Sequence, residues 1–387
     1  MSEARDIKAL KAAAWYTISS FISKAVLYLC TPIYTRLLST FEYGQYNNFL
    51  SWQSILTAII TFDLSASINT AYLDYKKGKN FDGFVSTISL FSVLIPLVIC
   101  MASLPLMDYM TGIFNLSHVH ILILMSYLCF ANVLGIFQTE QNIRMKYKLS
   151  SALTLISTCG GVAVTLILVF ILKNKLNAIL IGGVVLNELI SIILFAKILV
   201  RNKHIKKEYL KYALRIAIPL IPHVLASTIL GSSDKIMITK ICGSEKTAFY
   251  SLIYTISMLI TMFSSSANRA WVPWFFSKLQ EKDYHSIKKT IAWILPIGSL
   301  ASIVLCLLAP EIVLVIGGVK YQEAIYLMPP LVLHSVVNYY NTLYINIEFY
   351  NASKLKLACL LSHFSHIQLF VTLWTRPEPS RLLCPWD

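Results

Sequence analysis

The chain has 387 residues, of which 56% are hydrophobic and 13% are charged, whereas an ordinary soluble domain carries about 25% charged residues. Its mean hydropathy is +0.65, and apolar stretches of about 20 residues, each long enough to cross a bilayer, follow one another. These values exclude a soluble globular protein. The formal net charge of +14 lies mainly in short loops between apolar stretches, which is typical of membrane topology and not of nucleic-acid binding.

Ten membrane-spanning helices are predicted, preceded by a short basic arm with Arg5, Lys8 and Lys11. The first span is too long for the core of a signal peptide. Basic residues recur in the loop after every even-numbered span, so these loops and the N-terminus are predicted to be cytoplasmic. A marginal eleventh span is expected at 357–374. The ten spans are 14–35, 47–72, 84–107, 119–139, 152–172, 177–198, 213–239, 248–275, 290–316 and 325–347.

A weak internal repeat relates the two parts of the chain. The sequence ALKAA at 9–13 resembles ALRIA at 213–217, and the offset that takes position 9 to position 213 also aligns the basic loops after spans two and eight. Six spans per unit make the two units parallel repeats. We therefore expect an all-α polytopic membrane protein with two pseudo-repeated lobes around a central cavity. The expected parts are 1–211 with six spans, 212–357 with four spans, and an atypical tail at 358–387.

Polar and charged residues inside the predicted spans are the candidate site residues, because an ionisable group at mid-membrane costs about 2.5–3.5 kcal/mol on insertion scales. They recur at helical spacing and form stripes, which suggests a hydrated cavity where the two lobes face each other. Lys235 adjoins the stripe of span seven, and Arg269 adjoins that of span eight. The stripes are Ser20, Lys24, Tyr28, Thr31 and Thr35 in span one, Asp63, Ser67 and Thr70 in span two, His223, Ser227, Gly231 and Asp234 in span seven, and Ser257, Thr261, Ser264 or Ser265 and Asn268 in span eight.

Each candidate also has a purely structural interpretation. Polar stripes often join helices by hydrogen bonds, and Lys24 can pair with Asp63 or extend toward the membrane surface. Asp234 and Lys235 can lie at the outer end of span seven, where a charge needs no functional explanation.

The aromatic residues near Arg269 suggest that it anchors the helix at the membrane surface. Trp271 and Trp274 fit an aromatic belt at the membrane surface, and Arg269 beside them can be a simple anchor. Glu188, inside span six, has no evident partner in the sequence.

No signature of an enzyme is found. The chain has no Walker A motif, no GxGxxG after a strand, no HExxH and no GxSxG. The eight cysteines are scattered without CxxC spacing, so neither a metal site nor a cofactor is expected. We expect a protein that does not catalyse a reaction.

Several short segments give residues 1 to about 357 a resemblance to a known family. They are IYTRLLS at 33–39, EYGQY at 42–46, SSDK at 232–235, NIE at 346–348 and YNAS at 350–353. With them the chain resembles the Wzx-type polysaccharide biosynthesis flippases, which export O-antigen or capsule repeat units. Those flippases share a superfamily with MATE drug exporters and the lipid II flippase. Family members complete twelve or more helices, so a truncated second lobe is expected.

The resemblance implies a MATE-like fold with alternating access in the bacterial cytoplasmic (inner) membrane. Its cargo would be an undecaprenyl-diphosphate-linked oligosaccharide, held at the diphosphate by Lys24, Lys235 and Arg269. Asp63 is the expected coupling carboxylate, and Asp234 and Asn268 are further polar residues of the cavity. The expected partners are membrane lipids, a polysaccharide polymerase and a chain-length regulator, with no nucleic acid.

Three alternatives remain open. A MATE-type drug or ion antiporter would share the fold and differ in its cargo. A membrane-embedded polysaccharide polymerase would need a sizeable external loop with Arg or His, which the sequence lacks. A non-transporting scaffold would follow if the chain is truncated.

Overall fold

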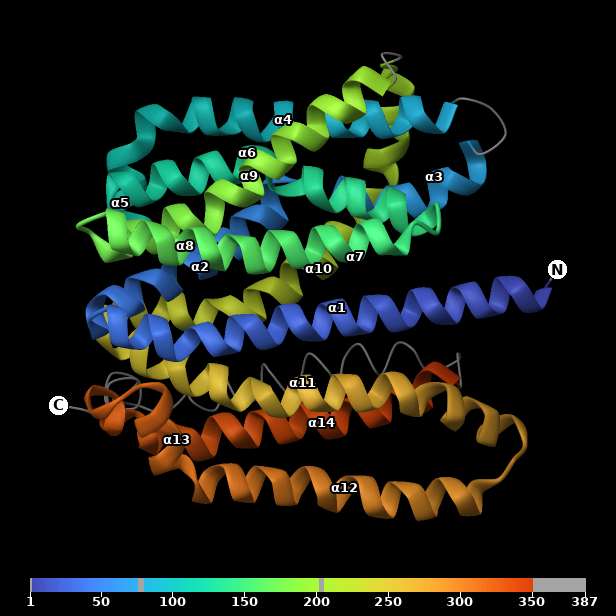
Figure 1. Ribbon diagram of the computed structural model, residues 1–387, viewed down its shortest axis with the longest axis vertical. Helices are drawn as coiled ribbons and strands as arrows, with labels where there is room; N and C mark the ends of the chain where they lie inside the picture. The colour runs from blue at the N-terminus through green and yellow to red at the C-terminus, as the bar shows by residue number, and fades with distance from the viewer. Residues whose placement is uncertain (1, 76–79, 202–204, 351–387) are drawn as a thin grey trace. The chain divides into compact units, whose positions relative to one another are not determined.

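The computed structural model describes residues 2–75, 80–201 and 205–350, and every regular element in these ranges is helical (Figure 1). The α-helices are α1 Ser2–Leu37, α2 Thr40–Ile60, α3 Ser67–Tyr75, α4 Asn80–Ser103, α5 Met107–Phe114, α6 His118–Ile143, α7 Tyr147–Leu155, α8 Gly161–Ile171, α9 Lys175–Arg201, α10 Lys207–Cys242, α11 Ser244–Gln280, α12 Tyr284–Leu307, α13 Ala309–Ile316 and α14 Met328–Tyr350. The short elements are η1 Leu64–Ala66, η2 Leu104–Leu106, the π-helical turn η3 Ile156–Gly160, and η4 Val319–Leu327. The predicted tail and the marginal eleventh span lie outside the described residues.

The chain divides into two compact units, Met1–Lys240 and Ile241–Asp387. The first unit includes most of α10, because Tyr209, Ala213 and Ala217 near the start of that helix are buried in the core of the unit. The predicted lobe boundary after residue 211 stays a prediction about the evolutionary repeat.

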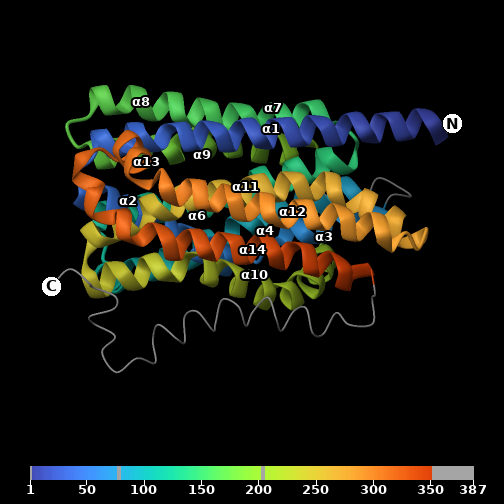
Figure 2. The ribbon, with the colours of Figure 1, turned by 90° about the horizontal axis from the view of Figure 1, so that it is seen from below.

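In the first unit, α4 packs on α6, and α6 packs on α9 (Figure 1). On another side, α1 runs along α7 (Figure 2), and α8 packs on α9. The core between α3, α4, α6, α9 and the start of α10 is a continuous apolar cluster, as expected for helices that bury one stripe each. Its fully buried members include Ile68, Phe84, Ile88, Val133 and Ile136.

The contact between α8 and α9 is close because Gly182 lies against the backbone of Thr165, where an added Cβ would overlap. Gly182 is therefore a position where two helices pack closely. Its neighbour Gly183 faces open space, so the two glycines differ in role although the sequence presents them as a pair.

The second unit is built on α11, α12 and α14, which pack on one another. Its aromatic core contains Trp271, which is 8% exposed and stacks on Phe275 with ring centroids 5.2 Å apart. Tyr339 of α14 belongs to the same cluster. The prediction of a surface belt is therefore wrong for Trp271, because its ring packs inside its own unit.

Among the described residues, seven helices are long and apolar enough to cross a membrane, or eight if α2 and α3 form one span. They correspond to predicted spans three to nine, with the bent pair as span two. Helices also form at the places of spans one and ten, α1 and α14. These two helices are outside the set of seven because they carry more polar residues. In α1 these are Lys24 and the hydroxyl stripe, and in α14 they are the Asn and Tyr residues.

Span two is broken and not continuous, which corrects the prediction of one helix over 47–72. The axes of α2 and the η1–α3 segment differ by 54°. At the break, Phe62 and Asp63 have φ values of 52° and 39°, a left-handed conformation that ends a right-handed helix. Asp63, Ser67 and Thr70 consequently do not form one continuous helical face.

Helix bounds in the two parts of the chain repeat at the offset predicted from sequence. Helices α2 and α11 begin at Thr40 and Ser244, which are related by that offset. Helices α4 and α12 begin at Asn80 and Tyr284, and both their first and their last residues show the same relation. The backbone therefore supports the internal repeat, since the start of α2 and both ends of α4 recur in register in α11 and α12.

Candidate transport site

Lys24 is exposed on α1, in the middle of the predicted first span. The stripe that contains it becomes buried toward the C-terminal end of the helix, where Thr31 and Thr35 are 8% and 0% exposed. Their hydroxyl groups donate to the backbone carbonyls of Leu27 and Pro32, at 3.4 and 3.1 Å. The stripe thus combines helix-packing hydroxyls with one exposed ammonium group.

Asp63 lies at the break between α2 and η1 and is half-buried. The hydroxyl of Ser65 donates to its carboxylate at 2.5 Å, and Ser67 is fully buried with its hydroxyl bonded to the carbonyl of Leu64 at 2.7 Å. Within the part of the chain that the structure describes, no ion pair joins Asp63 to Lys24. The interpretation of the two residues as a structural ion pair is therefore not supported.

The stripe of α10 is exposed over much of its length. His223, Ser227 and Gly231 are exposed, and a Cβ added at Gly231 would meet no neighbouring atom. Asp234 and Lys235 follow on the same helix and are half-buried. Together they give α10 an uncovered polar face within an otherwise apolar helix.

The stripe of α11 differs, because two of its hydroxyls are enclosed in the second unit. Ser257 and Ser264 are 1% and 8% exposed, and Ser257 donates to the carbonyl of Ile253 at 2.9 Å. Asn268 is half-buried, and the side chain of Arg269 lies outside the described residues. The burial of these two serines inside their own unit fits helix packing better than the lining of an open cavity.

The predicted site residues therefore distribute over the two units. Lys24, Asp63, Asp234 and Lys235 belong to the first unit and Asn268 and Arg269 to the second. Their assignment to one cargo site stays a prediction. No group of three or more His, Cys, Asp or Glu suited to a metal ion occurs among the described residues.

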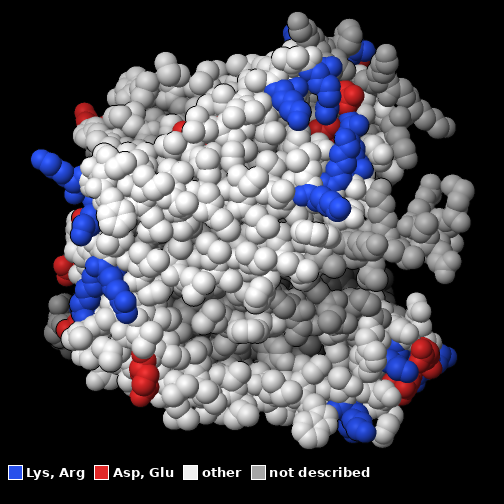
Figure 3. Space-filling view, viewed as in Figure 1, with Lys and Arg blue, Asp and Glu red and all other residues white. Residues whose placement is uncertain are grey.

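On the face of the first unit that Figure 3 shows, most charged side chains lie toward the helix ends. At one of these ends the structure contains a charge network that sequence reasoning missed. It joins Asp82 in the first turn of α4, Glu140 and Arg144 at the end of α6, and Arg201 at the end of α9. The network connects three helices on the side predicted to be cytoplasmic.

Glu140 is the centre of this network and is 0% exposed. Its Oε1 lies 2.8 Å from Nε of Arg144 and 2.7 Å from a terminal nitrogen of Arg201. Both arginines also pair with Asp82, Arg201 at 3.1 Å. The guanidinium of Arg144 lies 5.3 Å above the ring of Phe81, a favourable cation–π distance. The four residues carry no net charge together, so each charge has a counter-charge within the network.

The signal that could have revealed the network is the four-residue spacing of Glu140 and Arg144, which places them on one helix face. The sequence uses Arg144 and Arg201 only as members of the basic loops after spans four and six, which predict topology. Their partners Asp82 and Glu140 are distant in sequence from Arg201, so the pairing becomes visible only in the folded unit.

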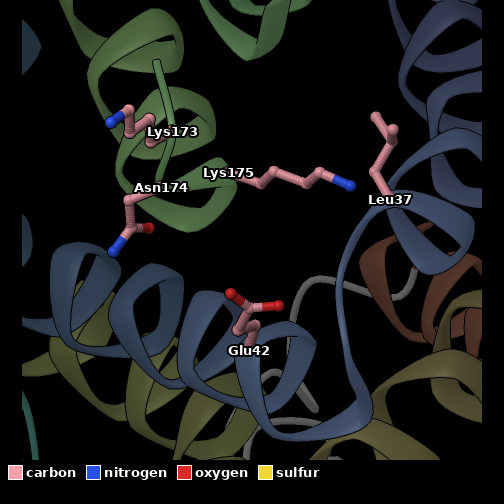
Figure 4. Close-up of a pocket in the computed structure, with 5 residues that line it drawn as sticks. All are labelled: Leu37, Glu42, Lys173, Asn174 and Lys175. Carbon is pink, nitrogen blue, oxygen red and sulfur yellow. The ribbon is translucent and has the colours of Figure 1, made fainter.

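An open cavity of about 530 Å³ lies at the other end of the helices, lined by Leu37, Glu42, Lys173, Asn174 and Lys175. The side chain of Lys175 extends across it toward Leu37, and Glu42 points into it (Figure 4). Glu42 is already engaged in the capping box of α2, where its carboxylate accepts from the backbone nitrogen of Ser39 at 2.8 Å. The cavity is therefore a basic surface at the side predicted to be extracytoplasmic.

Solved structures with a similar fold are transporters. An inward-facing conformation of a multidrug resistance MATE family transporter of the MOP superfamily aligns with a TM-score of 0.64 and 14% identity over 96% of this chain and 92% of that chain. A MATE structure in complex with MaD3S aligns with a TM-score of 0.60, 14% identity and coverage of 96% and 90%. An outward-facing conformation of a multidrug resistance MATE family transporter of the MOP superfamily aligns with a TM-score of 0.59 and 14% identity over 96% of this chain and 90% of that chain. The likeness confirms the all-α, MATE-like fold.

None of the curated proteins matches the sequence. The sequence pattern of the family described as "Polysaccharide biosynthesis protein" matches residues 9–280. That range includes the helices with Lys24, Asp63, Asp234, Lys235, Asn268 and Arg269 and more than half of the chain. The chain is a multi-pass membrane protein that belongs to the polysaccharide biosynthesis protein family.

Proposed function

We propose that the protein translocates undecaprenyl-diphosphate-linked O-antigen or capsular repeat units from the cytoplasmic to the outer leaflet by alternating access. The observation that carries the proposal is the exposed ammonium group of Lys24 at the middle of α1, in a chain of the polysaccharide biosynthesis family. A mid-membrane charge is costly and marks a pathway for a polar or ionic cargo.

The chemistry of the cargo fits cationic residues. A diphosphate that enters a region of low dielectric needs compensating positive charge, which Lys24, Lys235 and Arg269 would supply from α1, α10 and α11. The uncovered polar face of α10 would accommodate sugar hydroxyls, while the polyprenyl tail stays in the bilayer. No bond is made or broken in this process, so the protein would act as a transporter and not as an enzyme.

The test is transport of a radiolabelled undecaprenyl-diphosphate oligosaccharide in proteoliposomes. Lys24→Ala is expected to lower the rate about tenfold or more, because a hydrogen bond to a charged group contributes about 1.5–3 kcal/mol. Lys24→Arg retains the charge and should keep most of the activity. Lys288→Ala, at an exposed position on α12, is the matched control. Wild-type transport by Lys24→Ala at equal reconstitution would refute the role of Lys24.

A MATE-type exporter of drugs or ions is the second candidate, favoured by the similarity to multidrug resistance transporters over nearly the whole chain. The same proteoliposomes discriminate between the two by cargo. Efflux of a cationic dye without movement of the lipid-linked sugar would support the exporter. Formation of longer glycans from the lipid-linked unit would instead indicate a polymerase.

The proposed location is the bacterial cytoplasmic membrane with the N-terminus in the cytoplasm. A polysaccharide polymerase and a chain-length regulator are the proposed protein partners, since they act on the same glycan after translocation. Labelling of single cysteines in the basic loops with a membrane-impermeant reagent tests the orientation. Reaction in intact spheroplasts would contradict a cytoplasmic N-terminus.

A further inference from the structure

Glu188 occupies the midpoint of α9, since Lys175 and Arg201 at the two ends of the helix are equally far from it along the chain. At a rise of 1.5 Å per residue it is about 20 Å from each end. This is the depth at which an ionised carboxylate is least tolerated. The charged network and the basic cavity described above lie at the helix ends and are too distant to neutralise it.

The side chain lines a small cavity between α6 and α9, of about 120 Å³. The cavity is bounded by Tyr127, Phe130, Ala131 and Leu134 of α6 and by Asn187, Glu188 and Ser191 of α9. This volume exceeds what one water molecule needs. Polar groups line one part of the cavity and apolar groups another, so it has room and partners for a few water molecules beside the carboxyl group.

One carboxyl oxygen of Glu188 has no hydrogen-bond partner in the described part of the chain. This atom, Oε1, is buried, and the hydroxyl of Ser126 on the neighbouring α6 donates to the carbonyl of Ile123 at 2.9 Å. A buried polar atom without a partner is unfavourable in a native structure and calls for an explanation, such as a bound proton, ion or water.

No cationic side chain faces Glu188 from the helices packed against α9. The titratable groups toward the middle of these elements are Tyr127 and Cys129 of α6 and Cys159 of η3, and Cys100 near the C-terminal end of α4 adjoins Cys129. The remaining titratable groups of α4 and α6 lie near the helix ends, α8 carries none, and those of α2 are confined to its first two turns. The charge of Glu188 therefore has no protein counter-ion in this set of contacts, and a proton is the simplest group that removes the charge.

We propose that Glu188 is a proton-binding site of the first unit, which takes up a proton on its carboxylate in one state of the transport cycle and releases it in another. The uptake converts –COO⁻ to –COOH, and the proton comes from and returns to water through the small cavity. The link to transport rests on the proposed function, whereas proton binding itself does not. Asp63 is a weaker candidate for this role, because the hydroxyl of Ser65 already donates to its carboxylate.

Proton binding is tested without cargo by infrared difference spectroscopy on the full chain in nanodiscs while the pH is changed. Wild type should show a C=O stretch of a protonated carboxyl group that persists above the pH at which exposed carboxyls ionise. Glu188→Gln should lose this band, and Glu188→Asp should retain it at a shifted frequency. Asp108→Asn is the control, since Asp108 has a 97% exposed side chain. An unchanged band in Glu188→Gln would overturn the proposal.

Coupling is tested in proteoliposomes with the lipid-linked oligosaccharide and an imposed pH gradient. The gradient should accelerate transport by the wild type and leave Glu188→Gln unaffected, with Asp63→Asn still responding. Full response by Glu188→Gln, or loss of response only in Asp63→Asn, would overturn the coupling role. If no lipid-linked sugar moves even in wild type, the proposed function fails, and the infrared result still decides whether Glu188 binds a proton.

Discussion

Replacing Glu140 by Gln tests the charge network more sharply than deleting the whole network. The substitution preserves volume and one acceptor oxygen, and it removes the negative charge from the only member that is 0% exposed. Removal of one partner of a buried ion pair costs about 3–5 kcal/mol because the remaining charge is left uncompensated. Replacement of all members by apolar residues can be nearly neutral.

The structure lowers the expected cost below that range. The side chains of Arg144 and Arg201 are 29% and 34% exposed, so water screens part of their charge, and both retain Asp82 as a partner. We therefore expect Glu140→Gln to lower the free energy of unfolding by about 2–3 kcal/mol, which is roughly 30- to 150-fold in the unfolding equilibrium.

The assay is equilibrium unfolding in mixed micelles, followed by circular dichroism. Arg201→Gln should also lower the free energy of unfolding. The loss in the double variant should be smaller than the sum of the two single losses by about 1 kcal/mol or more, since the two residues share one interaction. Asp108→Asn, which alters an exposed pair with His118, should leave the unfolding midpoint unchanged. A change of less than about 0.5 kcal/mol in Glu140→Gln would refute the view that this network joins α4, α6 and α9.

Two further predictions concern packing and pH. Gly182→Val should lower the melting temperature clearly, because the new side chain would overlap the backbone of Thr165. Gly183 faces open space, so Gly183→Val should leave the melting temperature nearly unchanged. Equal decreases in the two variants would contradict the packing argument. Hydrogen bonds from Ser286 hold the pKa of Asp283 below its usual value at the start of α12. A lowered folded-state pKa stabilises the protein above the unfolded-state pKa, and this stabilisation is lost as the pH falls through the folded-state pKa. Asp283→Ala should therefore lower the melting temperature at neutral pH by an amount that shrinks in acid, and a pH-independent difference would contradict this.

The helices were predictable from sequence because the membrane requires every backbone group to be bonded within its own segment. The apolar runs therefore had to be helical, and the offset of the internal repeat anticipated the matching bounds of α4 and α12. The break at Phe62 and Asp63 was not predictable. Neither residue is a helix breaker by type, and their left-handed backbone precedes the η1 and α3 segments that pack against α6.

The candidate site was predictable only in part because spacing along a helix reveals a polar face and not what covers it. Ser257 on α11 and Ser227 on α10 recur at the same period, yet one is 1% exposed and the other is exposed. Both hydroxyls bond to a carbonyl one turn back, so each is satisfied whether or not a cavity is present. A charged group in the middle of a span has no such local partner, which makes Lys24 and Glu188 more informative than any stripe of hydroxyls. The experiments on these two residues therefore decide between a transport pathway and a set of helix contacts.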